Sequence, residues 1–332
     1  MHSCEVERTE PPPHAVSLVV DKCDKSSSHL LVRNVLKNKM AATPKQQDGS
    51  RPSFRSRDTT SWILDQDFKY NYTVCVTPLN YNYRDVEQLV EMIEVNRMLG
   101  ADHLVFYNYE SSDVVKPYFE YYADKGVELL PWALPVPVDV WPRKPGHIPQ
   151  IHYFAQLVAT NDCIYRSMLN SRYVVVTDLD EHIVARTEDT WDAMMQKLNQ
   201  QSNIGSWMFR NTFFRNDWED DESADPRAKE FKLRTILKTH REGTIFPASS
   251  RSKLIIRPLS IAYSGIHFVY KHLQGFATQN VEPDIALLHH YRIGFGDKEE
   301  GMDQRQEDRR MTKYQKQLIN RVKKTYDAVK KS

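Results

Sequence analysis

Two aspartates separated by one residue follow an apolar run, and their position suits them to chemistry. The run 174–177 reads Val-Val-Val-Thr and leads directly into Asp178, Leu179 and Asp180. Asp178 and Asp180 point to the same side while the chain remains extended. Two carboxylates so placed can share a Mn²⁺ or Mg²⁺ ion, which bridges a diphosphate and neutralises the charge that it gains on leaving.

The spacing of these aspartates is a weak signal by itself, because the chain also contains Asp65-Gln66-Asp67 ahead of its first expected strand. The location strengthens the signal. In an open parallel sheet, ligands bind beyond the carboxyl ends of the strands, where the run before Asp178 ends. The alternative interpretation is a solvated turn at the end of a strand.

Other polar residues could complete such a site. His290 follows the apolar residues 286–288, and a neutral imidazole suits Mn²⁺ better than Mg²⁺. A structural histidine is the alternative there. Lys253 and Arg292 are candidate contacts for phosphate oxygens, against the more usual role of surface charge.

The acidic loop 216–221 is the candidate source of a general base. Its members Asp217, Glu219 and Asp220 could each take a proton from a hydroxyl nucleophile if the loop flanks the site. A solvated acidic turn is the alternative for each of them.

The elements that must position these residues alternate between strand and helix. We expect strands at 72–77, 103–109, 127–134 and 173–177. Apolar residues at helical spacing predict one helix between each pair of successive strands, and Asp85 and Gly100 are placed to begin and end the first helix. The residues expected to face the core are, helix by helix, Val86, Leu89, Val90, Ile93 and Leu99; Val115, Tyr118, Phe119 and Tyr122; and Phe154, Leu157, Val158, Ile164 and Met168. The order indicates an α/β fold with a doubly wound sheet.

The second half has a different pattern. Ranges 207–214, 253–257, 261–269 and 286–291 are strand-like without regular helices between them, so we expect a mixed half packed on the first. We divide the chain into a disordered or stem-like arm over 1–65, a catalytic domain over 66–300 and a basic amphipathic helix over 301–332.

Composition excludes several classes of protein. The formal net charge of +1 gives no general basic field for nucleic acid. GxGxxG after a strand, GxxxxGK[ST] and GxSxG do not occur, which disfavours dinucleotide-binding, P-loop and serine hydrolase chemistry. No apolar stretch of about 18 residues and no signal peptide pattern occurs, so we expect no membrane anchor within this chain.

The cysteines leave the redox compartment open. Cys75 lies in an apolar strand pattern and Cys163 in a helical one, and we expect both to be small buried residues rather than a disulfide. Asn71-Tyr72-Thr73 is an N-glycosylation sequon, a triplet that arises readily by chance.

An ordered set of motifs over about residues 70 to 295 resembles glycosyltransferase family 92. The motifs are Val76-Thr77-Pro78-Leu79, Asn161-Asp162-Cys163, Tyr173 through Glu181, Arg251-Ser252-Lys253 through Pro258, Gly265-Ile266-His267 and His290-Tyr291-Arg292.

The resemblance implies a GT-A fold, with a nucleotide-sugar-binding first half and an acceptor-side second half. It implies Mn²⁺ (or Mg²⁺), a UDP-sugar donor, in particular UDP-galactose, and inverting transfer to a glycan or glycoprotein acceptor. It carries Asp178 and Asp180 over as the metal-binding pair and His290 as a third ligand, with His267 as an alternative. Thr77, Asp162, Lys253 and Arg292 become candidate contacts for the nucleotide sugar.

Family members are usually anchored in the Golgi membrane, so the resemblance implies the Golgi membrane or lumen, with membrane association only through an anchor absent from this chain. Two other functions stay open at this point. One is a metal-dependent phosphohydrolase with Asp178 as nucleophile, although that architecture expects its acids after the first strand of the series. The other is a non-catalytic nucleotide- or glycan-binding protein with the same fold.

Overall fold

The computed structural model describes residues 67–140, 146, 148–294 and 302–331, together with the backbone of two short strands, β1 (Ala15–Val16) and β2 (Leu30–Leu31). These two strands pair antiparallel within a unit that spans residues 1–57. Residues 58–332 form the second compact unit, which holds every element discussed below. The arm expected over 1–65 otherwise lies outside the described residues.

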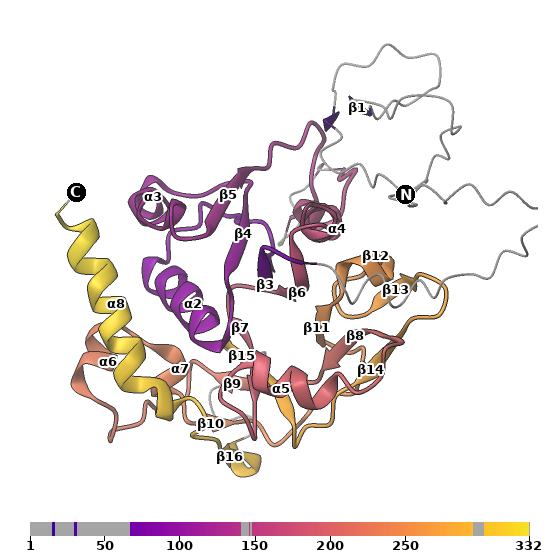
Figure 1. Cartoon of the computed structure of the whole chain (residues 1–332). Helices are drawn as coiled ribbons and strands as arrows, with labels where there is room; N and C mark the ends of the chain where they lie inside the picture. Colours follow the sequence, from indigo (N-terminus) through magenta and orange to yellow (C-terminus); the bar gives the residue numbers. More distant parts are fainter. Residues whose placement is uncertain are drawn as a thin grey trace, which may run out of the picture. The chain divides into compact units, whose positions relative to one another are not determined.

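A seven-stranded mixed sheet forms the centre of the second unit, in the order β14-β8-β11-β6-β3-β4-β5 (Figure 1). Its strands are β3 (Tyr70–Val76), β4 (His103–Asn108), β5 (Val127–Pro131), β6 (Ser171–Thr177), β8 (Ile204–Phe209), β11 (Lys253–Ile256) and β14 (Ala277–Asn280). β3 to β6 are parallel, as their alternation with helices predicts, whereas β11 runs antiparallel to both of its neighbours. The doubly wound α/β prediction is confirmed.

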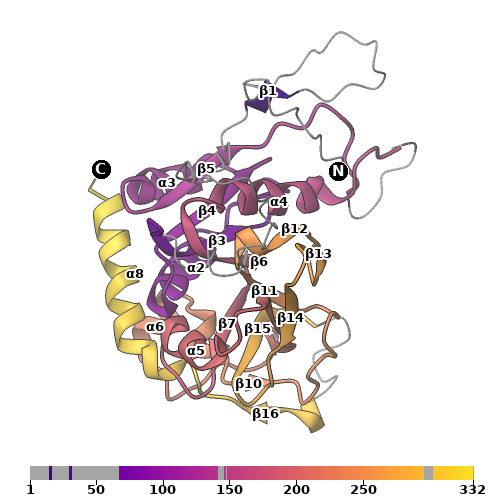
Figure 2. The same ribbon diagram turned by 45° about the vertical axis from the view of Figure 1, so that its right-hand side comes forward.

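Alternate residues of β3 face different layers, as the period of a strand requires. Val74 packs in the cluster that contains α2 (Val86–Leu99) and α8 (Gln315–Val329), whereas Cys75 packs towards α4 (Gln156–Ser167). Each face of the sheet therefore has its own apolar core. Figure 2 shows α2 and α4 on these different faces.

Cys75 and Cys163 form a disulfide that joins β3 to α4, with their Cα atoms 5.9 Å apart. Our expectation of two unlinked cysteines was therefore wrong. Both residues are buried, as expected, but their side chains meet because α4 packs directly across β3. Sequence spacing gave no indication of this contact, since 88 residues separate the two cysteines.

The helix α2 begins and ends where the sequence predicts. The Asp85 carboxylate accepts a hydrogen bond of 2.9 Å from the Gln88 backbone N–H, which satisfies one of the free donors of the first turn. Gly100 follows the last residue with a φ of 130°, a conformation that side-chain-bearing residues rarely adopt. Leu89, Val90 and Ile93 are fully buried against the sheet.

A second, three-stranded sheet packs beside the first, and a separate two-stranded hairpin follows β11. Two of the expected strands are each divided into two. The expected strand 207–214 is two strands, because Arg210 separates β8 from β9 and each joins a different sheet. The expected strand 261–269 is the antiparallel hairpin β12–β13. Their bounds are β7 (Glu181–Ala185), β9 (Asn211–Arg215), β15 (Ala286–Arg292), β12 (Ile261–Ser264) and β13 (Val269–His272).

Short helices interrupt the second half, which we expected to lack regular helices. They are α5 (Trp191–Leu198), α6 (Pro226–Glu230) and α7 (Arg234–Leu237), beside the small pair β10 (His240–Arg241) and β16 (Gln306–Glu307). The terminal helix α8 packs on α2 and on α3 (Lys116–Ala123), and Leu318, Ile319 and Val322 complete their core.

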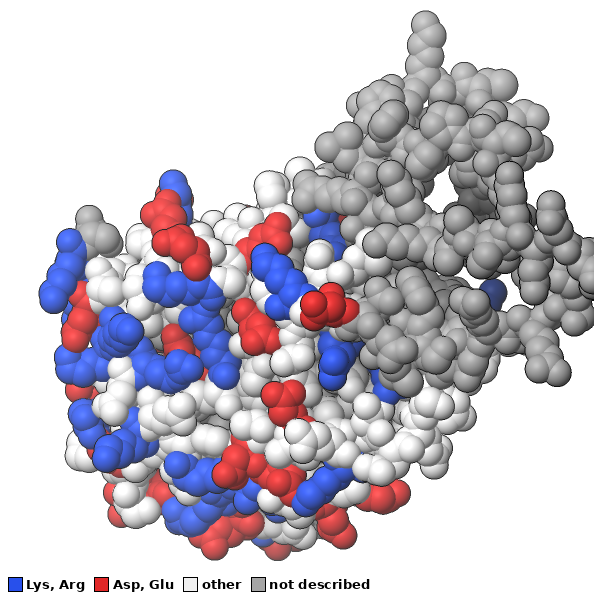
Figure 3. Space-filling view, viewed as in Figure 1, with Lys and Arg blue, Asp and Glu red and all other residues white. Residues whose placement is uncertain are grey.

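The described surface carries both signs of charge. In Figure 3, basic side chains gather along the left edge with acidic side chains among them. Among the described residues, no helix combines the length and the apolar character needed to cross a bilayer.

The disulfide generates the first prediction. Replacing Cys75 and Cys163 together with serine should lower the free energy of unfolding by about 2–5 kcal/mol, because a long closed loop no longer restricts the unfolded chain. Urea denaturation followed by circular dichroism measures this. Reduced wild-type protein is the control and should match the double variant. Alkylation of both thiols in unreduced, unfolded protein would contradict the prediction.

Candidate active site

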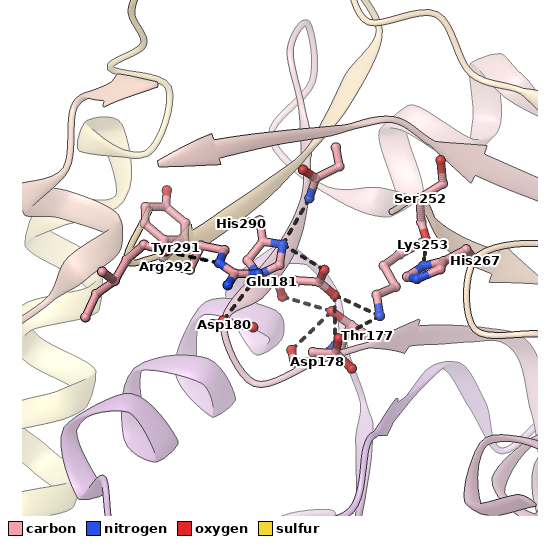
Figure 4. A network of polar contacts seen from close by, with 12 residues as sticks. Thr177, Asp178, Asp180, Glu181, Ser252, Lys253, His267, His290, Tyr291 and Arg292 are labelled. Carbon is pink, nitrogen blue, oxygen red and sulfur yellow. Dashed lines mark hydrogen bonds and ion pairs between the residues drawn. The ribbon is translucent and has the colours of Figure 1, made fainter. Parts of the chain in front are cut away.

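The turn that carries Asp178 and Asp180 is the point where the chain passes from the large sheet to the small one, between β6 and β7 (Figure 4). Its backbone is held at both ends. The Asp178 N–H donates to Glu181 Oε2 over 3.1 Å, and the Tyr291 N–H donates to the Asp180 carbonyl over 2.8 Å. The apolar strand β6 therefore delivers both carboxylates to a fixed place.

Lys253, the first residue of β11, lies fully buried behind this turn. Its ammonium donates to Asp178 Oδ2 at 2.8 Å and lies 3.1 Å from Glu181 Oε2. Burial alone would lower the pKa of Lys253, but the two carboxylates outweigh burial and raise it. Lys253 thus acts as a permanent positive charge beneath the acidic turn, rather than as a residue of the pocket wall.

His290 lies in β15, directly opposite Glu181 of β7. Its Nε2 is 3.2 Å from Asp180 Oδ2 and its Nδ1 is 3.1 Å from Glu181 Oε1. Burial opposes protonation, but Glu181 and Asp180 prevail and raise the pKa of His290 to about 9. The neighbouring His289 points the other way and stacks on Phe214, with ring centroids 4.3 Å apart.

Glu181 joins these two halves of the network. It is buried, and it contacts the Lys253 ammonium, the His290 imidazole and the backbone of Asp178. Burial raises the pKa of a carboxyl, but Lys253 and His290 reverse this and lower the pKa of Glu181. From the sequence, Glu181 was only a neighbour of the aspartates with no predicted role. In the structure, Glu181 lies at the centre of this network of charged groups.

A pocket of about 760 Å³ opens over the turn, large enough for a nucleotide-sized ligand. Among the residues singled out from the sequence, those that line it are Thr77, Asp178, Asp180, His267, His290 and Arg292. Residues of α4, β15 and the β12–β13 turn therefore converge with residues that directly follow β3, β6 and β9.

Asp162 does not line this pocket. It lies on α4, where it accepts a hydrogen bond of 2.7 Å from the Tyr107 hydroxyl and pairs with Arg166. The structure therefore gives Asp162 a role in joining α4 to β4 and does not bring it to the other candidates.

The acidic loop 216–221 is also placed differently from our expectation. The Arg215 guanidinium binds Asp217 through two hydrogen bonds of 2.6 and 3.2 Å, and this pairing helps to hold the pKa of Asp217 below its usual range. Glu219 and Asp220 line a separate pocket of about 400 Å³ beside Trp218. None of these three carboxylates lines the pocket over Asp178.

The start of α4 shapes one wall through an unusual backbone. Tyr153, Phe154 and Ala155 have φ values of 37°, 55° and 57°, so three successive residues other than glycine lie in the left-handed region. The helix begins after them rather than at Phe154, and Leu157 and Val158 are therefore 41% and 42% exposed instead of buried. This turn places Gln156 so that its amide donates to Asp178 Oδ1 over 3.2 Å.

Arg234 is a pocket residue that sequence reasoning missed. It begins α7, and the buried Glu91 of α2 fixes that helix by accepting hydrogen bonds from the backbone N–H groups of Arg234 and Thr235, at 3.1 and 2.8 Å. The helix has only four residues and the stretch has no apolar periodicity, so no sequence pattern could have placed this cation in the wall.

The residues at the opening of the pocket are of the chemical types that bind a divalent cation. Asp178 and Asp180 each expose 29% of their side chains to the pocket, and His290 contacts Asp180. Carboxylate oxygens with one imidazole nitrogen are a normal ligand set for Mn²⁺. Within the described residues, no group of three His, Cys, Asp or Glu side chains is already arranged around a cation position. Instead, Lys253 and His290 neutralise the carboxylates.

The model of Glycosyltransferase family 92 matches residues 70–329, and the chain belongs to this family. The match extends from the first residue of β3 to the last residue of α8.

A curated relative, the Beta-1,4-galactosyltransferase galt-1 of Caenorhabditis elegans, is 24% identical over 236 residues, which cover 69% of this chain and 50% of the relative. The chain thus spans about half the length of that protein. Two solved structures are similar at low scores. S. aureus TarS 1-349 in complex with UDP has a TM-score of 0.34 and 11% identity, covering 67% of this chain and 60% of that chain.

The other is glucosyl-3-phosphoglycerate synthase from Mycobacterium tuberculosis in complex with Mn²⁺, uridine-diphosphate and glucosyl-3-phosphoglycerate. It has a TM-score of 0.29 and 15% identity, covering 85% of this chain and 86% of that chain. At such low scores, these two structural similarities give no evidence beyond the strand order and the family match.

The buried lysine generates the second prediction. Lys253→Met should lower the free energy of unfolding by about 3–5 kcal/mol, because Asp178 and Glu181 would keep their charges without a buried cation between them. Lys116→Met is the matched control. Its partner Glu120 lies 3.9 Å away with both side chains about two-thirds exposed, so its loss should cost under about 1 kcal/mol. Equal urea midpoints for the two variants would rule out this role of Lys253.

Proposed function

We propose that the protein transfers a hexose, galactose, from a UDP-sugar to a hydroxyl of a glycan acceptor with inversion at the anomeric carbon. The observation that carries the proposal is the fixed Asp178–Asp180 turn at the mouth of the 760 Å³ pocket. Family membership supports transfer of a sugar. The name of the Caenorhabditis elegans relative supports galactose as that sugar.

Asp178, Asp180 and His290 would hold Mn²⁺ or Mg²⁺ in this proposal, with His290 giving up the proton that it carries between Asp180 and Glu181. A cation so bound would offset the negative charge that develops on the departing diphosphate. The protein itself adds positive charge, because Arg292 and Arg234, whose guanidinium also pairs with Asp85, line the same pocket. Arg is suited to phosphate oxygens through its planar set of donors.

The sugar of the donor requires polar partners of its own. Asn216 lines the pocket, and its amide nitrogen donates to the Tyr291 carbonyl over 3.0 Å. Its Oδ1 is buried without a hydrogen-bond partner in the protein. Because Asn216 lines the pocket, we assign its side chain to a hydroxyl of the donor sugar.

His267 is our candidate for the base that takes the acceptor proton. It lines the pocket, and its Nδ1 lies 3.0 Å from the Ser252 carbonyl. Donation from Nδ1 to this carbonyl leaves Nε2 as the basic nitrogen. Burial and then the nearby Lys253 ammonium lower the pKa of His267, so its imidazole is neutral at physiological pH.

In the proposed step, Nε2 of His267 receives the proton of the acceptor hydroxyl. The acceptor oxygen forms a bond to the anomeric carbon, and the bond from this carbon to the diphosphate breaks with its electron pair leaving on UDP. The proton, the electron pair and the leaving group are thereby accounted for. A phosphohydrolase or a non-catalytic binding protein, which remained open from the sequence, has no observation in its favour here.

We propose the lumen of the secretory pathway, in the Golgi, as the site of action. The Cys75–Cys163 disulfide supports this, because such bonds persist in oxidising compartments and are rare in the cytosol. The sequon residue Asn71 is exposed at the start of β3, which leaves its side chain accessible.

The third prediction tests the metal-binding pair. Asp178→Asn and Asp180→Asn should each lower Mn²⁺-dependent release of UDP from UDP-galactose at least about hundredfold, since each removes a charged ligand near the leaving group. Thermal unfolding should change little, because Glu181 remains as a partner for Lys253 and His290.

The matched control for these variants is Asp67→Asn, which alters an exposed aspartate of the other Asp-x-Asp triplet, away from the pocket lining. Full activity in either site variant, or an equal loss in Asp67→Asn, would remove the basis for the metal assignment. Release of inorganic phosphate instead of UDP would favour a phosphohydrolase.

The fourth prediction concerns His267. His267→Asn retains a donor towards Ser252 but lacks the basic nitrogen, so kcat should fall about hundredfold while KM for the donor stays within twofold. In the wild type, kcat should fall only at a pH below the ordinary pKa of histidine, because burial and Lys253 lower the pKa at which this imidazole takes up a proton. A wild-type kcat in His267→Asn would exclude His267 as the base.

A further inference from the structure

Three aromatic rings lie exposed together on the β12–β13 hairpin. Tyr263 of β12 and Tyr270 of β13 are 39% and 53% exposed, and Phe268 at the start of the return strand is 37% exposed. The Tyr270 ring centroid lies 5.8 Å from that of Tyr263 and 4.8 Å from that of Phe268. We call these three side chains the aromatic platform.

The platform continues into the wall of the pocket. The hairpin turn between Gly265 and Phe268 contains Ile266 and His267, and both of these residues line the pocket over Asp178. Figure 2 shows the hairpin beside α4 and near β11 of the large sheet. A molecule lying on the platform can therefore extend into the pocket past His267.

The hairpin is rigidly attached to α4. The buried Asn161 side chain donates to the Ser264 carbonyl and accepts from the Ser264 N–H, each over 2.8 Å. The Tyr165 hydroxyl donates to the Ala262 carbonyl over 2.6 Å. These three hydrogen bonds fix the platform at a constant position relative to the pocket.

Gly265 is required for the packing of the turn. A Cβ atom at this position would lie 2.8 Å from the Tyr270 ring and 2.8 Å from the Phe268 carbonyl oxygen. The missing side chain lets the Tyr270 ring lie across the turn.

We propose that the aromatic platform binds sugar rings of the acceptor glycan and directs its reacting hydroxyl towards His267; this inference rests on the proposed function. Sugar rings present C–H faces bordered by hydroxyls, and an aromatic ring with a polar group at its edge matches both. The tyrosine hydroxyls and the exposed Lys271, which pairs in register with Tyr263, provide such polar groups.

The test measures acceptor and donor kinetics of the full chain separately. UDP-galactose is supplied with a mixed set of fluorescent oligosaccharides released from glycoproteins, and UDP release is followed with and without these acceptors. Tyr270→Ala should raise the acceptor KM about tenfold, while slow hydrolysis of UDP-galactose by water and the donor KM stay unchanged. Tyr270→Phe keeps the ring and should remain within about twofold of the wild type.

Tyr263→Ala, on the other strand, repeats the test and should raise the acceptor KM in the same direction, so the proposal does not depend on the folding of one variant. Wild-type acceptor KM values in both alanine variants, with donor hydrolysis intact, would overturn the platform and leave the proposed function standing. Absence of UDP release from the wild type would overturn both. Tyr270-dependent cosedimentation with phosphatidylcholine vesicles, without an effect on acceptor KM, would show that the rings contact lipid instead.

Discussion

The site depends on the charge of one buried ammonium group. Asp178, Asp180 and Glu181 bring three carboxylates into a short stretch of chain, and their mutual repulsion in a poorly hydrated place would oppose folding. Lys253 lies against two of these carboxylates and His290 against the third. The negative charge of the three carboxylates is therefore nearly balanced before any ligand binds. β11 lies antiparallel between β6 and β8 in the large sheet, and this position brings Lys253 to the carboxylates.

This arrangement explains why the chain changes sheets at the aspartates. β6 belongs to the large sheet and β7 to the small one, and the turn between them is fixed from both sides. β15 contributes His290 through the small sheet, whereas β11 contributes Lys253 through the large sheet. The relative position of the two sheets thus sets the distances between the charged groups, and the mouth of the pocket lies at their junction.

The sequence could predict the features that depend on local pattern. Hydrophobic periodicity located β3, α2 and β6, and the break from Val176 to Asp178 located the acidic turn. It could not predict features that arise from long-range contact. The Cys75–Cys163 bond and the hydrogen bond from the Gly294 N–H to the Asp217 carboxylate depend on which segments meet in space. The left-handed turn before α4 reversed the expected burial of Leu157, because apolar spacing does not register where a helix begins.

The alternation of side chains along β15 has a consequence for how the chain can vary. His289 and His290 occupy opposite faces, one stacked on Phe214 in the interior with its pKa lowered by burial to about 3, the other between Asp180 and Glu181. A slip of one residue in the pairing of β15 with β7 would exchange them. Because both residues are histidine, an imidazole would still face the carboxylates after that slip, but every other side chain of β15 would change faces as well. An insertion in the connection before Ala286 is therefore tolerable only if β15 keeps its register with β7.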